Sequence, residues 1–198
     1  MKHIFLRGTN PEKTLVLFHG TGGTEEDLIP VGKRIDPKAN ILSLRGTVNE
    51  QGMLRFFKRL DKGVFDEDDI KIRAEEIVKF LETASKEYGF NLDHLTGIGY
   101  SNGANIMAAI YYLHGNIFSK AILFHAMVPL KDSPTTTLEN TQIFMGAGKN
   151  DSMVPFENTK RLADQLRVME SKVTLRTYHN GHSLTADEVN DAAIWYSG

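Results

Sequence analysis

Residues 95–105 read LTGIGYSNGAN, and this stretch decides the fold. Residues 95–99 form a short apolar run that predicts a buried strand, whereas residues 102–114 are apolar on nearly every side and predict a buried helix. The five residues GYSNG at 99–103 join the two elements. A sharp turn from strand to helix places a serine hydroxyl above the sheet, and glycines on either side relieve the crowding at that turn. The motif alone is a weak signal, but in this context it makes Ser101 a candidate nucleophile.

The same alternation of short apolar runs and helical patterns continues through the rest of the chain. Strands are expected at 14–18, 40–44, 120–124, 142–145 and 172–178, with an edge strand at 3–7. Helices are expected between Asp69 and Gly89, from Pro155, and after the capping-box residues Thr185 and Glu188. Strands that alternate with helices imply right-handed crossovers and a largely parallel sheet. We therefore expect one α/β domain over residues 1–198, with helices on both faces of a mostly parallel sheet.

The length and composition of the chain are sufficient for one substantial hydrophobic core. Of 198 residues, 41% are hydrophobic, and 23 Lys and Arg against 25 Asp and Glu give a formal net charge of −2. This balance argues against disorder and against a nucleic-acid partner, which would favour an excess of basic residues. No apolar run approaches the ~20 residues that span a bilayer, and residues 1–10 lack the apolar core of a signal peptide. We expect a cytoplasmic protein without membrane insertion and, because cysteine is absent, without disulfides or thiolate nucleophiles.

A serine nucleophile needs a base, because its hydroxyl is weakly reactive at neutral pH. Among seven histidines, His182 lies in the loop expected between the last strand and the last helix, and His179 lies at the end of that strand. His182 is therefore favoured as the base, with His179 as its rival. Asp151 follows the strand at 142–145 and precedes both histidines. Alone it could be a turn or capping aspartate, but its order after Ser101 favours a role in orienting the base.

The loop after the strand at 14–18 reads HGTGG at 19–23. Small residues there allow a backbone N–H to approach a developing oxyanion, and a donor of this kind contributes about 2.7–4 kcal/mol of transition-state stabilisation. We assign this role to the N–H groups of Thr21 and Asn102. A phosphate-binding loop is the competing interpretation, but no Gly-Lys-Ser/Thr follows, which excludes a Walker site.

Five further residues are candidate substrate contacts: Arg45, Arg55, Phe56, Met127 and Val154. Guanidinium groups pair bidentately with carboxylates, but either arginine could equally pair with Glu50 or Asp61. Phe56 could line an acyl pocket, although an aromatic side chain near a sheet edge more often belongs to the core. Met127 and Val154 each follow a predicted strand, where loops build sites in α/β sheets.

Three other features receive structural interpretations. His125 is taken as a hydrogen-bonded structural histidine, and His19 as a support for its loop. The acidic run at 66–69 lies at a predicted helix start, where the positive end of the helix dipole favours carboxylates. That explanation needs no metal ion, so no metal site is predicted.

With these motifs the chain resembles the α/β-hydrolases, and within them the small carboxylesterase/phospholipase group that includes acyl-protein thioesterases. The resemblance rests on HGTGG at 19–23, GYSNGAN at 99–105, Asp151 followed by Val154-Pro155, and Gly181-His182. The stretch at 44–57 is more narrowly similar to a bacterial subgroup of cytoplasmic esterases. The resemblance implies a Ser101, Asp151 and His182 triad, hydrolysis of carboxylic esters or thioesters, no metal or organic cofactor, and a possible homodimer.

Two departures from the group shape the expected substrate. The thioesterases usually carry glutamine after the nucleophile, where this chain has Asn102, and no insertion is long enough to form a large lid. We therefore expect a serine hydrolase that cleaves carboxylic esters of small soluble molecules through an acyl-serine intermediate. Thioester or lysophospholipid cleavage by the same residues is the alternative. A ligand-sensing protein that retains the fold but lacks the chemistry is the non-enzyme alternative.

Overall fold

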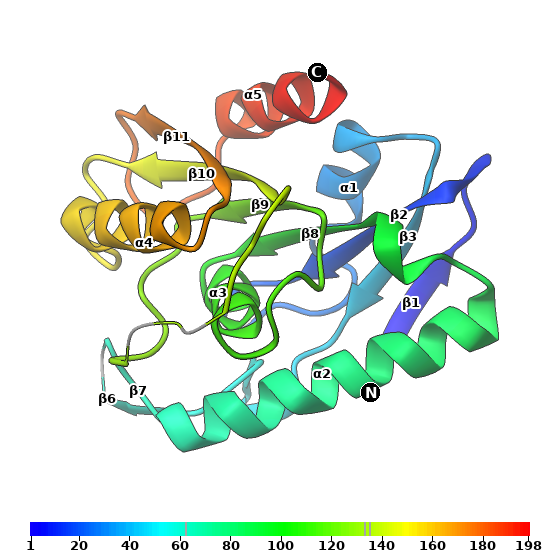
Figure 1. The fold of residues 1–198 in the computed structure, drawn as a ribbon. Helices are drawn as coiled ribbons and strands as arrows, with labels where there is room; N and C mark the ends of the chain where they lie inside the picture. The colour runs from blue at the N-terminus through cyan, green and yellow to red at the C-terminus, as the bar shows by residue number, and fades with distance from the viewer. Residues whose placement is uncertain (62, 133, 135) are drawn as a thin grey trace.

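The central feature of the computed structural model, which describes residues 1–61, 63–132, 134 and 136–198, is a seven-stranded sheet (Figure 1). Its strands lie in the order β1 (His3–Leu6), β3 (Ala39–Leu44), β2 (Asn10–Phe18), β8 (Leu95–Tyr100), β9 (Lys120–Phe124), β10 (Gln142–Gly148) and β11 (Lys172–Tyr178). Only β1, at one edge, is antiparallel to its neighbour; the other neighbouring pairs of this sheet run parallel. The predicted α/β class with a mostly parallel sheet is confirmed.

Helices cover both faces of the sheet (Figure 1). One face carries α2 (Glu67–Tyr88), α3 (Asn102–His114) and α4 (Phe156–Val168), and the other carries α1 (Ile29–Ile35) and α5 (Ala186–Ser197). Residues 15–18, at the end of β2, show why a covered strand can be continuously apolar. Val16 and Phe18 pack in the first layer, whereas Leu15 and Leu17 pack in the second. Because both faces of the sheet are covered here, residues 15–18 are all buried, and each such side chain contributes roughly 1.5–3 kcal/mol.

The helix ends follow the sequence signals with one small correction. The Asp66 side chain caps α2 by accepting from the N–H of Asp69, and Gly89 ends the helix with a left-handed φ of 75°. The Thr185–Glu188 capping box at the start of α5 is present. Pro155, which was expected to be the first residue of a helix, is instead the residue before α4. Its fixed φ suits both positions, and the shift is one residue.

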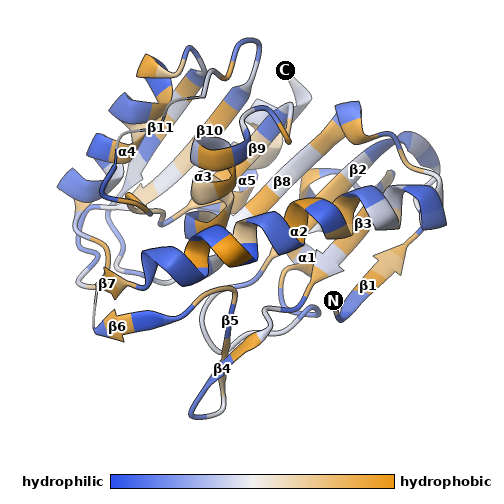
Figure 2. Cartoon of the chain, turned by 60° about the horizontal axis from the view of Figure 1, so that its bottom comes forward, coloured by the Kyte–Doolittle hydropathy of each residue, from blue (hydrophilic) through white to orange (hydrophobic). Residues whose placement is uncertain are grey.

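Neither α1 nor the two hairpins of the stretch at 45–65 was expected from the sequence. These hairpins pair β4 (Val48–Glu50) with β5 (Met53–Arg55), and β6 (Arg59–Asp61) with β7 (Val64–Phe65). Figure 2 shows β4 and β5 projecting away from the sheet, below α2. A short 3-10 helix at Leu92–His94 precedes β8. None of the helices in the described ranges is both long enough and apolar enough to cross a membrane.

Candidate active site

Ser101 occupies the sharp turn between β8 and α3 that the sequence predicts. Its φ of 52° and ψ of −114° are unusual for a residue with a side chain, and the turn is held by its N–H, which donates to the Phe124 carbonyl at 2.9 Å. A Cβ on Gly103 would lie 2.1 Å from the Phe18 carbonyl oxygen, and one on Gly99 would lie 2.7 Å from the backbone of Ala104. Both glycines are therefore required by close backbone contacts. Strain of this kind, of order 1–3 kcal/mol, persists where the surrounding structure fixes it.

The loop between β11 and α5 brings His182 to Ser101. His182 Nε2 lies 2.9 Å from Ser101 Oγ, and His182 Nδ1 lies 2.8 Å from Asp151 Oδ2. A carboxylate oxygen only accepts, so Nδ1 carries the proton and Nε2 accepts from the serine hydroxyl. The Tyr100 hydroxyl donates to the His182 carbonyl at 2.7 Å and so fixes the loop. His179, the rival base, is exposed at the end of the strand.

Asp151 is held in place from both sides of its carboxylate. Oδ1 accepts from the N–H groups of Met153 at 2.8 Å and Val154 at 2.9 Å, while Oδ2 faces His182 and His125. Burial alone would raise the pKa of Asp151, but the hydrogen bonds from Val154, His182 and His125 outweigh it and lower that pKa below its usual value. The residue therefore makes the turn contacts expected of an ordinary loop aspartate and also presents a charged oxygen to His182.

The residues expected at the oxyanion site lie with Ser101 around one cavity of about 90 Å³. It is lined by Thr21, Arg55, Arg59, Gly63, Phe65, Ser101, Asn102, Asn105, Met127, Met153, Val154 and His182. Asn102 is the first residue of α3, where helix N–H groups have no acceptor within the helix. A larger hollow of about 350 Å³ is lined by residues that include Lys13, Thr96 and Lys120, at the opposite ends of the strands from Ser101.

The loop that carries Thr21 is fixed by His19, which has the supporting role expected for it. The N–H of Gly46 donates to His19 Nε2 at 3.0 Å, so the proton resides on Nδ1, which lies 2.6 Å from the Gly20 carbonyl. Burial lowers the pKa of His19, in agreement with this neutral ring. Gly22 has a φ of 80° and donates its N–H to the Leu54 carbonyl, which ties the loop to the hairpin β4–β5.

The structure separates the five expected substrate contacts into two groups. Arg55, Met127 and Val154 line the cavity with Ser101. Arg45 pairs instead with the buried carboxylate of Glu25, a partner that sequence reasoning did not consider, and lies outside the set of cavity-lining residues. Phe56 is 1% exposed and packs against Phe18 and His19 in the core, with ring centroids 5.4 and 4.8 Å away. Phe56 is therefore a core residue, which was the alternative to a place in the acyl pocket.

Several cavity residues were not predicted from the sequence: Arg59, Gly63, Phe65, Asn105 and Met153. Two of these had usable signals. Asn105 lies one helical turn after Ser101, and its side chain accepts from the N–H of Met127 at 2.9 Å, which positions that loop. Met153 lies between Asp151 and Val154, and its side chain is exposed. The other three belong to the hairpin β6–β7, whose position cannot be read from local patterns.

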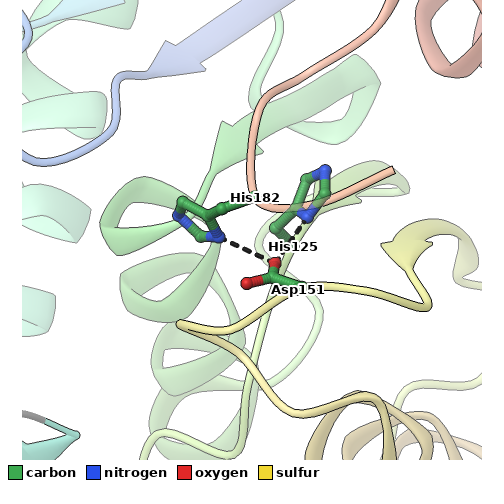
Figure 3. A group of neighbouring side chains, drawn as sticks. All are labelled: His125, Asp151 and His182. Atoms are coloured by element: carbon green, nitrogen blue, oxygen red, sulfur yellow. Dashed lines mark hydrogen bonds and ion pairs between the residues drawn. The ribbon is translucent and has the colours of Figure 1, made fainter. Parts of the chain in front are cut away.

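His125 lies beside the Ser101 site and is hydrogen bonded, as expected for a structural histidine (Figure 3). Its Nδ1 is 2.9 Å from Asp151 Oδ2, the same oxygen that faces His182. This grouping of two histidines and an aspartate also has the ligand types of a metal site. Two ligands of one tetrahedral zinc ion lie ~3.3 Å apart, however, because each is about 2.0–2.1 Å from the metal. The observed separations of 2.8 and 2.9 Å are those of hydrogen bonds.

A family model, a curated relative and solved structures all relate this chain to hydrolases of one family. The family model for phospholipase/carboxylesterase matches residues 2–195. The chain is 41% identical over 196 residues to "Putative hydrolase MhqD" of Bacillus subtilis (strain 168), covering 99% of this chain and 98% of that protein. It is similar to the crystal structure of the Bacillus cereus carboxylesterase, with a TM-score of 0.98, 41% identity, and coverage of 100% of this chain and 93% of that one.

A third similarity is to the structure of YahD with malic acid, with a TM-score of 0.94, 29% identity, and coverage of 99% of this chain and 98% of that one. The family match spans nearly the whole described fold, including the turn at Ser101 and the loops that carry Asp151 and His182. The chain therefore belongs to the phospholipase/carboxylesterase family of α/β-hydrolases.

Proposed function

We propose that this hydrolase cleaves carboxylic esters of small molecules through an acyl-serine intermediate, with residues 1–198 acting as one catalytic domain. The single observation that carries the proposal is the continuous contact from Ser101 Oγ through His182 to Asp151, at 2.9 and 2.8 Å. A nucleophile, a base and a group that orients the base are what acyl transfer requires.

In this mechanism Ser101 Oγ attacks the ester carbonyl while His182 Nε2 accepts the hydroxyl proton. Asp151 holds the imidazole in the tautomer with the proton on Nδ1 and stabilises the imidazolium that forms. The N–H groups of Thr21 and Asn102 bind the oxyanion of the tetrahedral intermediate. His182 then donates its proton to the departing alkoxide. Water, activated by the same imidazole, hydrolyses the acyl-serine and regenerates the hydroxyl.

A fluorophosphonate probe tests this proposal against the ligand-sensing alternative. The probe reacts with an activated serine and so requires the base as well as the hydroxyl. We expect one adduct per chain, located at Ser101 by mass spectrometry of the digested protein. Folded protein that gives no adduct at Ser101 would favour a binding protein over an enzyme. Turnover of aryl esters, acyl-CoA thioesters and lysophospholipids, compared in one panel, then separates ester hydrolysis from the thioesterase and lysophospholipase alternatives.

The size and charge of the cavity favour a substrate with a short acyl group and a negative charge. Its volume of about 90 Å³ is well below the ~300 Å³ at which drug-sized pockets begin. Two arginines line it, Arg55 and Arg59, and both approach one carboxylate, Glu50, at 3.5 and 3.3 Å. Among the described residues that line the cavity, the two guanidinium groups are the permanently charged ones, and Glu50 is not among them. The structural relative YahD was solved with malic acid, a dicarboxylic acid. We propose that Arg55 favours esters that carry a second carboxylate.

Replacement of Arg55 by methionine tests this preference. Arg55 also donates to the Thr21 hydroxyl at 2.9 Å, so the variant affects turnover of every substrate. The informative quantity is therefore the ratio of kcat/KM for a nitrophenyl monoester of a short dicarboxylic acid to that for a neutral ester of equal length. We expect this ratio to fall by about 10–100-fold, the value of a charge-assisted hydrogen bond. The Arg45→Met control, outside the cavity, leaves the ratio unchanged; equal losses on both substrates in Arg55→Met would refute the preference.

A further inference from the structure

His125 is enclosed between two carboxylates in the interior of the protein. Its Nδ1 lies 2.9 Å from Asp151 Oδ2 and its Nε2 lies 2.9 Å from Glu188 Oε1. The His125 and Glu188 side chains are 0% exposed, and that of Asp151 is 1% exposed. Figure 3 shows His125 and His182 approaching Asp151 from different sides. Since bulk water does not reach this cluster, its charges are stabilised mainly by the groups that form it.

The contacts of both carboxylates favour their ionised forms. Glu188 Oε2 accepts from three donors, which are Asn180 Nδ2 at 2.9 Å and the N–H and hydroxyl of Thr185, both at 2.8 Å. Asp151 Oδ1 accepts two backbone N–H groups, as described above. Burial opposes ionisation of Glu188, but its contacts with His125 and Thr185 outweigh this and lower its pKa. Each end of the His125 ring therefore faces a negatively charged oxygen.

Only one protonation state of His125 suits both neighbours. A neutral imidazole has one N–H and one lone pair, so one nitrogen would direct its lone pair at a carboxylate oxygen. The imidazolium presents an N–H to each carboxylate. The contact to Glu188 has ion-pair distance without the angle of a full hydrogen bond, so its attraction is mainly that of opposite charges. Burial would lower the pKa of His125, but Glu188 and Asp151 together raise it.

We propose that His125 is a positioning residue that stays protonated, holding Asp151 toward His182 and neutralising one of the two buried negative charges. The proposal rests on the proposed function, because it concerns the group that orients the base. Asp151, His125 and Glu188 then carry a combined charge of −1, which the imidazolium formed at His182 during catalysis balances. Glu188 thereby links the capping box of α5 to the site.

The groups around His125 come from four parts of the fold. Asp151 belongs to the loop after β10, Glu188 to α5, and His182 to the loop after β11, with its ring centroid 5.3 Å from that of His125. Tyr100, at the end of β8, packs edge-on at 5.8 Å. Burial first, then the charges of Asp151 and Glu188, raise the pKa of Tyr100, so its hydroxyl stays neutral. His125 is therefore a charged group whose ring packs directly beside that of His182.

The variant His125→Asn separates the charge from the hydrogen bond. Asparagine Nδ2 takes the position of histidine Nδ1 and can still donate to Asp151, but it carries no charge. The site becomes more negative, which favours protonated His182, so the base becomes free only at higher pH. We expect the acidic limb of the kcat/KM profile to move upward by about 1 pH unit. The matched control His179→Asn changes an exposed histidine at the start of the loop that carries His182 and should keep the wild-type profile.

Nitrogen-15 NMR of the histidine rings provides a second measurement, on the wild-type protein. At pH 8 both ring nitrogens of His125 should give signals of protonated nitrogen, whereas an ordinary histidine with a pKa near 6.5 is neutral. A neutral His125 would overturn the proposal, and so would a folded His125→Asn variant whose acidic limb coincides with the wild type. If that variant does not fold, the NMR result decides. This measurement needs no turnover, so failure of the proposed function, seen as no labelling of Ser101, is distinguishable from failure of this inference.

Discussion

Replacement of Ser101 by alanine lowers kcat for a short-chain nitrophenyl ester by a factor on the order of 10⁶, the expected loss when such a serine is removed. The reason is specific to this site. The 2.9 Å contact between Ser101 Oγ and His182 Nε2 couples attack to proton removal, and alanine leaves His182 with nothing to deprotonate. The oxyanion donors and the cavity remain, so the variant should retain only the small residual acceleration that binding and the oxyanion site provide.

The Ser101→Ala variant should fold as well as the wild type, because alanine at this turn meets the same backbone strain as serine and removes no buried apolar contact. Thermal unfolding checks this directly. Ser183→Ala is the matched control, since Ser183 is exposed next to His182 and its carbonyl, which alanine keeps, accepts from Asn180 Nδ2. Ser183→Ala should retain full turnover. Substantial esterase activity in folded Ser101→Ala protein would assign the nucleophile elsewhere.

The sheet was predictable because both of its faces are covered. At the end of β2, residues 15–18 are directed alternately to opposite layers and are all buried, so this part of the strand is a continuous apolar run that can be recognised in the sequence. The turn at Ser101 was predictable for a related reason. The Phe18 backbone leaves no space for a Cβ at Gly103, and the Ala104 backbone leaves none at Gly99. The turn therefore requires glycine at both positions, and the two glycines can be recognised in the sequence.

The contacts that could not be predicted join segments whose pairing has no local signature. Arg45 was expected to bind substrate or to pair with Glu50 or Asp61, but the fold places Glu25 beside it. Glu188 was recognised from the sequence as a capping residue, and its second oxygen, which faces His125, depends on how α5 packs on the sheet. The hairpins of the stretch at 45–65 bring Arg55 and Arg59 to the cavity although their strands are only three residues long.

The two histidines of the last loop provide the sharpest test of the proposed base. His182→Ala should lower kcat by about as much as Ser101→Ala, on the order of 10⁶, since a nucleophile and its base act as a unit. His179 lies three positions earlier and is exposed, so His179→Ala should keep most of the activity. Loss of activity in His179→Ala with activity retained in His182→Ala would exchange the two assignments.

The double variant Ser101→Ala/His182→Ala carries this argument further. If Ser101 and His182 contributed separately, their losses would multiply and the double variant would be far slower than either single variant. Because the hydroxyl is useful only when His182 accepts its proton, and His182 is useful only when the hydroxyl is present, we expect the double variant to be no slower than Ser101→Ala. Steady-state kinetics of the three variants at one pH, on one nitrophenyl ester, measures this. A further large loss in the double variant would show that His182 acts independently of Ser101, which the contact of 2.9 Å between their side chains argues against.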